Sequence, residues 1–264
     1  RKILEFFLAR ADLGLFLHFE MVPDRLPVEL RELIERFPAG SLQFEVGIQT
    51  WNTQVAALVS RRQDYGKIGE NLRYLREHTG VHVHADLIAG LPGETWESFA
   101  TGFDALWELR PHEIQLGILK RLRGTPIARH TEKWDMSYEP FAPYTILSNK
   151  CLSYAQVQEL VRIAKHWDLV ANRGHFPRAL ELLGELRVQA RHGGSFFSVI
   201  RSLSAHLTAR HATLHSIALP SLVESVWAFL TAEAGLAPET VREALAYDYA
   251  GRGVSRDLPP YLRA

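Results

Sequence analysis

Residues 81–95 read Val-His-Val-His-Ala-Asp-Leu-Ile-Ala-Gly-Leu-Pro-Gly-Glu-Thr, and this stretch predicts a strand that ends in a sharp turn before a helix. Apolar residues alternate with polar ones along its first part, and residues 90–93 supply the glycines and proline of a turn. Thr95 is then a suitable N-cap for a helix that runs to Leu109. A strand, a short turn and a helix in this order form the repeating unit of parallel sheets.

The same alternation continues on both sides of that unit. Four strands are predicted, at Leu15–Met21, Phe44–Gln49, Val81–Ala89 and Glu113–Leu119. Helices are predicted between them, at Pro27–Phe37, Ile68–Thr79 and Thr95–Leu109. Residues 1–125 are therefore expected to form an α/β domain with parallel strands, either half of an eight-unit barrel or part of an open sheet.

The pattern changes after residue 125. Residues 126–150 contain three prolines and are expected to form an irregular connection. Beyond it no useful strand alternation occurs, and helices are predicted at 153–170, 177–191, 195–210, 220–235 and 238–249. Residues 126–264 are therefore expected to form an all-α domain.

Composition excludes several classes of protein. The chain has 264 residues, with 30 Lys and Arg balanced by 30 Asp and Glu, which argues against a strongly basic nucleic-acid binder. No apolar run reaches the roughly 18 residues that a membrane helix needs. The single cysteine, Cys151, excludes an internal disulfide and fits a reducing compartment, so a cytoplasmic protein is expected. Residues 1–8 resemble the middle of a helix and lack an initiator Met, which favours a fragment or processed form.

Three polar residues lie at or near the ends of predicted strands. Gln49 ends one strand, Arg61 follows twelve residues later, and Asp86 lies within the next strand. Ligand-binding groups of parallel α/β folds collect at the carboxyl ends of strands. An amide, a guanidinium and a carboxylate could hold a ligand that carries both a carboxylate and hydroxyl groups. Spacing alone favours the plainer interpretation, in which Arg61 is solvated and Asp86 caps or pairs locally.

Four ordered motifs resemble a known superfamily. They are Phe44–Thr50, Leu58–Asp64, Ala85–Thr95 and Ile118–Pro126. In order and spacing they are similar to the radical S-adenosylmethionine (SAM) superfamily, to its oxygen-independent coproporphyrinogen oxidase branch and more closely to its cobalamin-binding members. Residues 143–148, with Trp167-Asp168 further on, are similar to a helical domain that follows the barrel in many cobalamin-type members.

The resemblance implies a fold and a SAM site. Residues 1–125 would be the C-terminal portion of a partial (β/α) TIM-like barrel. Gln49 would contact the ribose hydroxyls, Arg61 the methionine carboxylate, and Asp86 the ribose or the amino group. The adenine would be lined by the backbone of Ile88, Ala89 and Gly90 and closed from the next strand by Ile118 and Leu119. In such enzymes a [4Fe–4S] cluster reduces SAM to give a 5′-deoxyadenosyl radical.

The chain also departs from that superfamily. The Cys-x3-Cys-x2-Cys loop that holds the cluster is absent, as are the glycine-rich second-strand motif and any cobalamin domain. The expected cluster loop would lie upstream of Arg1, so SAM would bind here while the cluster and cobalamin belong to the intact parent only. This fragment alone is expected to be inactive. The less favoured interpretation is a homologue that has lost the cluster.

The function implied for the parent is radical chemistry such as methyl transfer or rearrangement, on an unknown small molecule or peptide. The alternative is a non-catalytic helical interaction module on a vestigial α/β scaffold. Neither a membrane nor a nucleic acid is expected as a partner. The sheet edge beside Leu15–Met21 would be exposed and could mediate self-association.

Histidines offer two further candidates. His18 and Glu20 point to the same side of their predicted strand, as a substrate-side catalytic pair or as a buried hydrogen-bonded pair that fills the barrel. His82 and His84 also share a strand face, as a possible pair of metal ligands or as exposed side chains. Since no third ligand is close in sequence, no metal site is expected.

Overall fold

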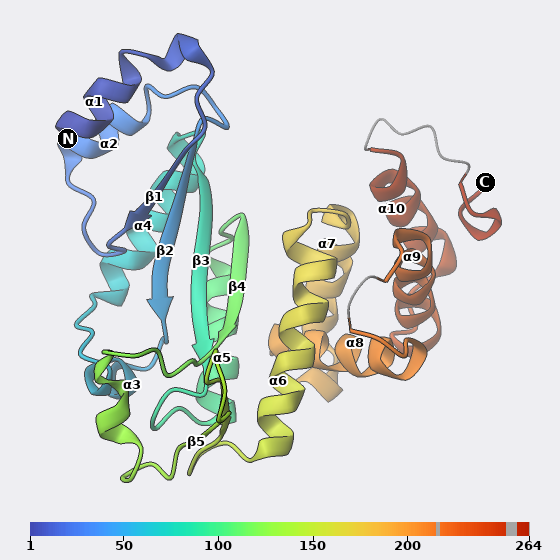
Figure 1. Cartoon of the computed structure of the whole chain (residues 1–264). Helices are drawn as coiled ribbons and strands as arrows, with labels where there is room; N and C mark the ends of the chain where they lie inside the picture. Colours follow the sequence, from blue (N-terminus) through green and yellow to red (C-terminus); the bar gives the residue numbers. More distant parts are fainter. Residues whose placement is uncertain (215–216, 252–257, 264) are drawn as a thin grey trace. The chain divides into compact units, whose positions relative to one another are not determined.

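The computed structural model describes residues 1–214, 217–251 and 258–263. The chain divides into two compact units, Arg1–Gln158 and Glu159–Ala264 (Figure 1). Each unit has its own buried core, and the two are described separately below.

Unit 1 is built on a four-stranded parallel sheet in the order β1-β2-β3-β4 (Figure 1). The strands are β1 (Leu17–Met21), β2 (Leu42–Gln49), β3 (His82–Ala89) and β4 (Glu113–Ile118). The helices are α1 (Lys2–Leu8) before β1, α2 (Val28–Ile34) before β2, α3 (Thr53–Leu58) and α4 (Tyr65–His78) before β3, and α5 (Trp96–Glu108) before β4. A short 3₁₀ segment, η1 (Ala11–Leu13), follows α1. The predicted α/β fold with four parallel strands is confirmed.

The two faces of the sheet differ sharply in polarity. Because successive strand residues point to opposite faces, Val46, Ile48, Ala85 and Leu87 share one face, where each is at most 1% exposed. Helices α4 and α5 cover that face, behind the sheet in Figure 1, and contribute fully buried side chains such as Leu75 and Phe103.

The other face, called the polar face from here on, carries charged and amide side chains. Its members are His18, Glu20, Gln43, Glu45, His82, His84, Asp86, Glu113 and Gln115. The parallel register aligns them in rows, so that Glu20 is opposite Glu45, Glu45 opposite His84, and His84 opposite Glu113. Parallel sheets that are packed on both faces carry apolar side chains on both. The polar face is therefore not packed against a hydrophobic core.

Local side-chain caps explain where the helices of unit 1 begin. Thr95 caps α5 as predicted, since its hydroxyl accepts a hydrogen bond from the Ser98 N–H at 3.1 Å. Asp64 caps α4 by accepting from the Lys67 N–H at 3.1 Å, so α4 starts three residues earlier than predicted.

The segment after β4 remains part of unit 1. It contains a 3₁₀ segment, η2 (Pro126–His130), and two short antiparallel strands, β5 (Ser137–Tyr138) and β6 (Ile146–Ser148). The Ile146 N–H donates to the Leu119 carbonyl at 2.9 Å, and the Asn149 side-chain amide donates to the Gly90 carbonyl at 3.1 Å. These bonds tie the connection to the ends of β3 and β4, so the compact units divide at Gln158 and Glu159 rather than at residue 125.

Unit 2 is helical, in agreement with the prediction. Helix α6 (Tyr154–Trp167) leads into it and is followed by α7 (Pro177–Glu185), α8 (Phe196–Arg210), α9 (Leu219–Ala228) and α10 (Pro238–Ala250). Short π-helical segments, η3 (Asp168–Asn172) and η6 (Phe229–Glu233), extend α6 and α9. Three 3₁₀ segments complete it: η4 (Leu186–Val188), η5 (Ala190–His192) and η7 (Pro260–Leu262). The helix predicted at 177–191 is therefore shorter than expected.

The core of unit 2 is rich in aromatic rings. Phe176, Phe196, Phe197 and Phe229 are each at most 1% exposed. Asp248 is buried and accepts hydrogen bonds from the first backbone N–H groups of α7, those of Arg178 and Ala179, at 3.0 Å each. Within the described ranges, none of the helices is long and apolar enough to cross a bilayer.

Candidate functional site

A cavity of about 640 Å³ opens near the carboxyl ends of β1 and β2, on the polar face of the sheet. Strand residues, the segment after β1 and the loop between α3 and α4 line it: Glu20, Met21, Val22, Pro23, Asp24, Arg25, Glu45, Gly47, Gln49, Ser60, Arg61, Arg62, Gln63 and Asp86. Gln49, Arg61 and Asp86, which the sequence singles out, all line this one cavity. Ligands of parallel α/β folds bind at this end of the strands.

Gln49 reaches the cavity because the end of β2 is distorted. The register of β2 against β3 shifts between Gly47 and Gln49, and Gln49 adopts a left-handed backbone with φ of 71°. Its side-chain amide lies over Gly47, where an added Cβ would come within 2.7 Å of Nε2. The absence of a Cβ at Gly47 therefore leaves the space that the Gln49 amide occupies.

Arg61 is anchored at the rim of the cavity by its own contacts. Its backbone N–H donates to the Ala56 carbonyl at 2.8 Å, which ties the residue to helix α3. Its guanidinium donates through Nη1 to the Gly47 carbonyl at 2.7 Å, and the Gln63 amide donates to the same carbonyl at 3.3 Å. The Arg61 side chain is exposed, so a planar cation with a fixed orientation faces the cavity.

Asp86 is the most electrostatically perturbed group of the site. The pKa of Asp86 is raised from 3.8 to about 6, mainly by burial; Glu45 contributes to the rise, and His84 and Arg61 oppose it. Asp86 Oδ1 lies 3.5 Å from His84 Nε2, and both atoms are buried without a hydrogen-bond partner. Because Asp86 Oδ1 makes no hydrogen bond in the protein, it is available to accept one from a ligand.

His18 and Glu20 lie on the same face of β1, and their substrate-side role stays a prediction, but His18 contacts a different carboxylate. His18 Nε2 lies 3.2 Å from Glu45 Oε2 on the neighbouring strand, and both side chains are more than a third exposed. Glu20 instead lines the cavity, while His18 does not. The polar face thus links His18 to the site through Glu45.

The five residues predicted to enclose the adenine lie together at the ends of β3 and β4. The Leu119 N–H donates to the Ala89 carbonyl at 2.9 Å, and Gly90 turns the chain with φ of 93°. Ile88 and Ile118 are half-buried, whereas Ala89, Gly90 and Leu119 are buried. None of the five lines the cavity, so their contact with adenine stays a prediction.

Glu94 is a residue whose role the sequence does not reveal. It is 1% exposed, and Oε1 accepts hydrogen bonds from the Thr50 hydroxyl at 2.9 Å and the Ser98 hydroxyl at 2.8 Å. Burial raises the pKa of this carboxyl. Glu94 therefore fastens the exit of β2, next to Gln49, to the start of α5. Its signal in the sequence is a charged residue inside the turn that follows β3.

Glu45 also belongs to the site, and the sequence contains a signal for it. With alternation of two along β2, Glu45, Gly47 and Gln49 fall on one face, so Glu45 could be inferred from Gln49. What the sequence does not provide is the register that brings Glu45 between Glu20 and His84.

His82 and His84 have separate partners. His82 Nε2 is 2.7 Å from Glu113 Oε1, and His84 faces Asp86. In the described part of the chain, no group of three or more His, Cys, Asp or Glu side chains is arranged to hold a metal ion. The one cysteine, Cys151, follows β6 and cannot supply the three thiolates of a cubane cluster, so the residues present do not fit that group.

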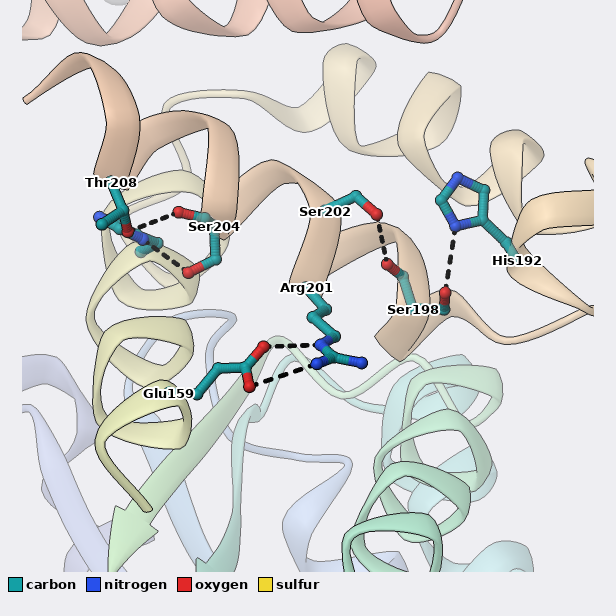
Figure 2. A network of polar contacts seen from close by, with 8 residues as sticks. Glu159, His192, Ser198, Arg201, Ser202, Ser204 and Thr208 are labelled. Atoms are coloured by element: carbon teal, nitrogen blue, oxygen red, sulfur yellow. Dashed lines mark hydrogen bonds and ion pairs between the residues drawn. The ribbon is translucent and has the colours of Figure 1, made fainter. Parts of the chain in front are cut away.

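Unit 2 has its own network of polar contacts, which involves several residues of α8 (Figure 2). Arg201 donates to both carboxylate oxygens of Glu159, at 2.6 and 3.3 Å. The buried His166 ring meets the Ser204 hydroxyl at 2.8 Å through Nδ1, and burial lowers the pKa of His166 to about 4. A neutral, hydrogen-bonded imidazole in the core is consistent with a structural role for this part of the network.

In part of its sequence the chain is similar to radical SAM enzymes, the class that its motifs resemble. Over 93 residues the chain is 34% identical to the oxygen-independent coproporphyrinogen III oxidase of Escherichia coli, covering 35% of this chain and 20% of that enzyme. The solved structure of that oxidase, described as a radical SAM enzyme, matches with a TM-score of 0.35 and 29% identity over 39% of this chain and 23% of its own.

More specifically, the chain belongs to the family described as "Protein of unknown function (DUF4080)", whose model matches residues 132–264. It is also similar to the uncharacterized protein YtqA of Bacillus subtilis, at 31% identity over 119 residues, which cover 45% of this chain and 36% of YtqA.

A structure of the radical SAM methyltransferase TsrM from Kitasatospora setae, with tryptophan and a SAM analogue bound, matches with a TM-score of 0.48 and 16% identity. That match covers 66% of this chain and 41% of TsrM. Among the curated relatives, the matched regions cover only 36% of YtqA and 20% of the coproporphyrinogen oxidase.

Proposed function

We propose that this chain supplies the SAM-binding part of a radical SAM enzyme of the cobalamin-dependent type, whose chemistry is methyl transfer or a rearrangement. The observation that carries the proposal is the meeting of Gln49, Arg61 and Asp86 in one cavity. They come from β2, from the loop after α3 and from β3, yet all three line the same space. The motif resemblance assigns these positions to SAM.

The chemistry of the three side chains fits the methionine and ribose parts of SAM. The Arg61 guanidinium is oriented by the Gly47 carbonyl and presents a planar fork that suits a carboxylate. The Gln49 amide suits a hydroxyl group. Asp86 Oδ1 makes no hydrogen bond within the protein and can accept one from a hydroxyl or an ammonium group. When bound, SAM supplies the sulfonium group that radical SAM chemistry cleaves, and the residues here orient it.

Other parts of the proposed enzyme have no residues in this chain. With one cysteine, the cluster ligands are proposed to lie in the sequence that precedes Arg1 in a longer parent, and the cobalamin site likewise. Such a cluster needs a reducing environment, which supports a cytoplasmic location.

The proposal is tested by calorimetric titration of SAM into the purified chain. A charge-assisted hydrogen bond contributes about 1.5–3 kcal/mol, so Arg61→Ala should weaken SAM binding by about 10- to 150-fold. Arg61→Lys should recover the affinity only in part, because lysine lacks the planar fork. Arg36→Ala is the matched control, since Arg36 is exposed and does not line the cavity.

Two results would contradict the proposal. Normal SAM binding by Arg61→Ala, together with loss in Gln49→Ala, would show that Arg61 is not the carboxylate partner. Absence of SAM binding by a folded wild-type chain would favour the alternative, a helical interaction module on a vestigial scaffold. Melting temperatures of each variant confirm that an affinity change does not come from unfolding.

A further inference from the structure

Unit 2 contains a cavity of about 290 Å³ that is lined by helices α6 and α8, and it is called the interhelical cavity from here on. Its lining includes Glu159 and Arg162 of α6 and Arg201, Ser204, Ala205 and Ala209 of α8. The residues from α8 recur at intervals of three and four, so they form one face of that helix. Two arginines against one glutamate give the lining a formal charge of +1.

The single carboxylate of the lining is already paired across the two helices. Arg201 donates to both oxygens of Glu159, at 2.6 and 3.3 Å, and Figure 2 shows the two side chains pointing toward each other from α8 and α6. Arg162 follows Glu159 by three residues, a spacing at which a glutamate and an arginine can pair on one helix. Because Glu159 is directed toward Arg201 instead, no carboxylate among the described residues pairs with Arg162. A guanidinium that lines a cavity without a counterion is suited to an anion that enters from solvent.

Ser204 adds a hydroxyl group to the same lining. Its Oγ lies 2.8 Å from Nδ1 of His166, whose ring is 2% exposed and whose Nε2 has no partner in the protein. Burial lowers the pKa of His166 to about 4, so the neutral ring carries a single proton at pH 7. Buried N–H groups without an acceptor are rarer than buried acceptors without a donor, which places this proton on Nδ1. The Ser204 hydroxyl then accepts from His166 and keeps its own hydrogen for a ligand.

From this geometry we infer that the interhelical cavity binds the carboxylate of a small organic acid that has a compact apolar body. Arg162 pairs with the carboxylate, Ser204 donates a further hydrogen bond, and Arg201 adds positive charge. The formal charge of +1 favours a monoanion, and the methyl groups of Ala205 and Ala209 offer contacts to an apolar body.

The size and the position of the cavity bear on this inference in two ways. Its volume lies near the lower end of the roughly 300–1,000 Å³ that is typical of ligand pockets, so a small molecule suits it. All of its lining residues belong to unit 2, so the inference does not depend on the SAM site proposed for unit 1.

The test uses benzoate as the probe, because it joins one carboxylate to a compact apolar ring. Benzylamine is a cationic probe of similar size, and inorganic phosphate is an anion of higher charge. Each is titrated into the whole chain with NMR detection of the alanine methyl groups. Benzoate should bind and should move the signals of Ala205 and Ala209 but not that of Ala228 on α9, which does not line the interhelical cavity. Benzylamine should not bind.

Two variants should change benzoate affinity in opposite directions. Arg162→Gln should weaken binding by about tenfold, because a charge-assisted hydrogen bond is lost. Glu159→Gln should tighten binding by about threefold, because it removes the one acidic charge of the lining and nearly keeps the shape of the side chain. Arg210→Gln is the matched control: it removes an arginine from α8 outside the interhelical cavity, where Arg210 pairs with Glu224, and it should leave the affinity unchanged. Melting temperatures show that each variant is folded.

Several results would overturn the inference. Absence of benzoate binding, or binding that Arg162→Gln leaves unchanged, would show that the cavity is not a carboxylate site. Equal weakening by Arg210→Gln would show a general effect of positive charge, and weaker binding by Glu159→Gln would show that the ion pair maintains the cavity rather than competes with the ligand. Tighter binding of phosphate would show that the site takes a more highly charged anion than a carboxylate. Benzoate binding by a chain that does not bind SAM would support this inference while the proposed function fails.

Discussion

The substitution Gly47→Ala should change the geometry of the cavity without destabilising the fold. Gly47 is at the bulge of β2 and contributes its carbonyl to Arg61. A Cβ at this position would lie 2.7 Å from Gln49 Nε2 and 3.5 Å from Arg61 Nη2. Both atoms are the far ends of flexible side chains, so the side chains would move while the backbone stays.

The two effects of this substitution have opposite signs. Gly47 does not have a left-handed backbone, so alanine should leave the fold intact or stabilise it by about 0.4–1 kcal/mol through the unfolded state. Displacement of the Gln49 amide removes one neutral hydrogen bond to the ligand, worth about 0.5–1.5 kcal/mol, so SAM affinity should fall by about two- to twelvefold.

The assay pairs calorimetric titration of SAM with thermal unfolding. Gly69→Ala is the matched control: its Cβ would be 3.6 Å from the Leu109 side chain, an ordinary contact in helix α4, which does not line the cavity. Unchanged SAM affinity in Gly47→Ala would refute the placement of Gln49 over Gly47. A large drop in its melting temperature would refute the claim that only side chains need to move.

Three further outcomes are expected. The pKa of Asp86 is raised from 3.8 to about 6, mainly by burial, so the free energy of unfolding should be highest below the unfolded-state pKa and should fall as pH rises through about 6. Asp86→Asn should therefore raise the melting temperature at about pH 7.5 and not at about pH 4. Ser204→Ala should cost about 1–3 kcal/mol in urea unfolding, since it leaves Nδ1 of buried His166 without a partner, while Ser202→Ala on the same helix should cost less. Edge strand β1 should pair between copies, so light scattering at tens of micromolar should show a dimer or larger species, and a monomer would argue against it.

The sequence predicted the architecture of unit 1 well because its physical signals are local. Alternating polarity marks β3, and the hydroxyl of Thr95 marks the start of α5, so both could be found without tertiary information. The convergence of Gln49, Arg61 and Asp86 followed from a motif resemblance, since spacing alone did not favour it.

What the sequence could not predict depends on contacts between distant segments. The 126–150 connection has no periodicity, and its place is set by bonds such as that from Asn149 to the Gly90 carbonyl. The helix predicted at 177–191 ends early, and Gln189 beyond it is extended and donates to the Ala234 carbonyl at 3.1 Å. His18 pairs with Glu45 rather than with Glu20 because register, and not sequence distance, decides which side chains meet across strands.

The division of the sheet into a helix-covered face and a polar face has a consequence for how this family diverges. The two faces share a backbone but no side chains, so residues on the polar face can be exchanged without disturbing the core on the other side. Substitutions among relatives should therefore alternate along β2 and β3, with positions such as Val46 and Ala85 nearly constant and positions such as Glu45 and His84 more variable. A change in binding specificity would then need substitutions at only a few alternate positions of β2 and β3. These substitutions would leave the core residues, and therefore folding, unchanged.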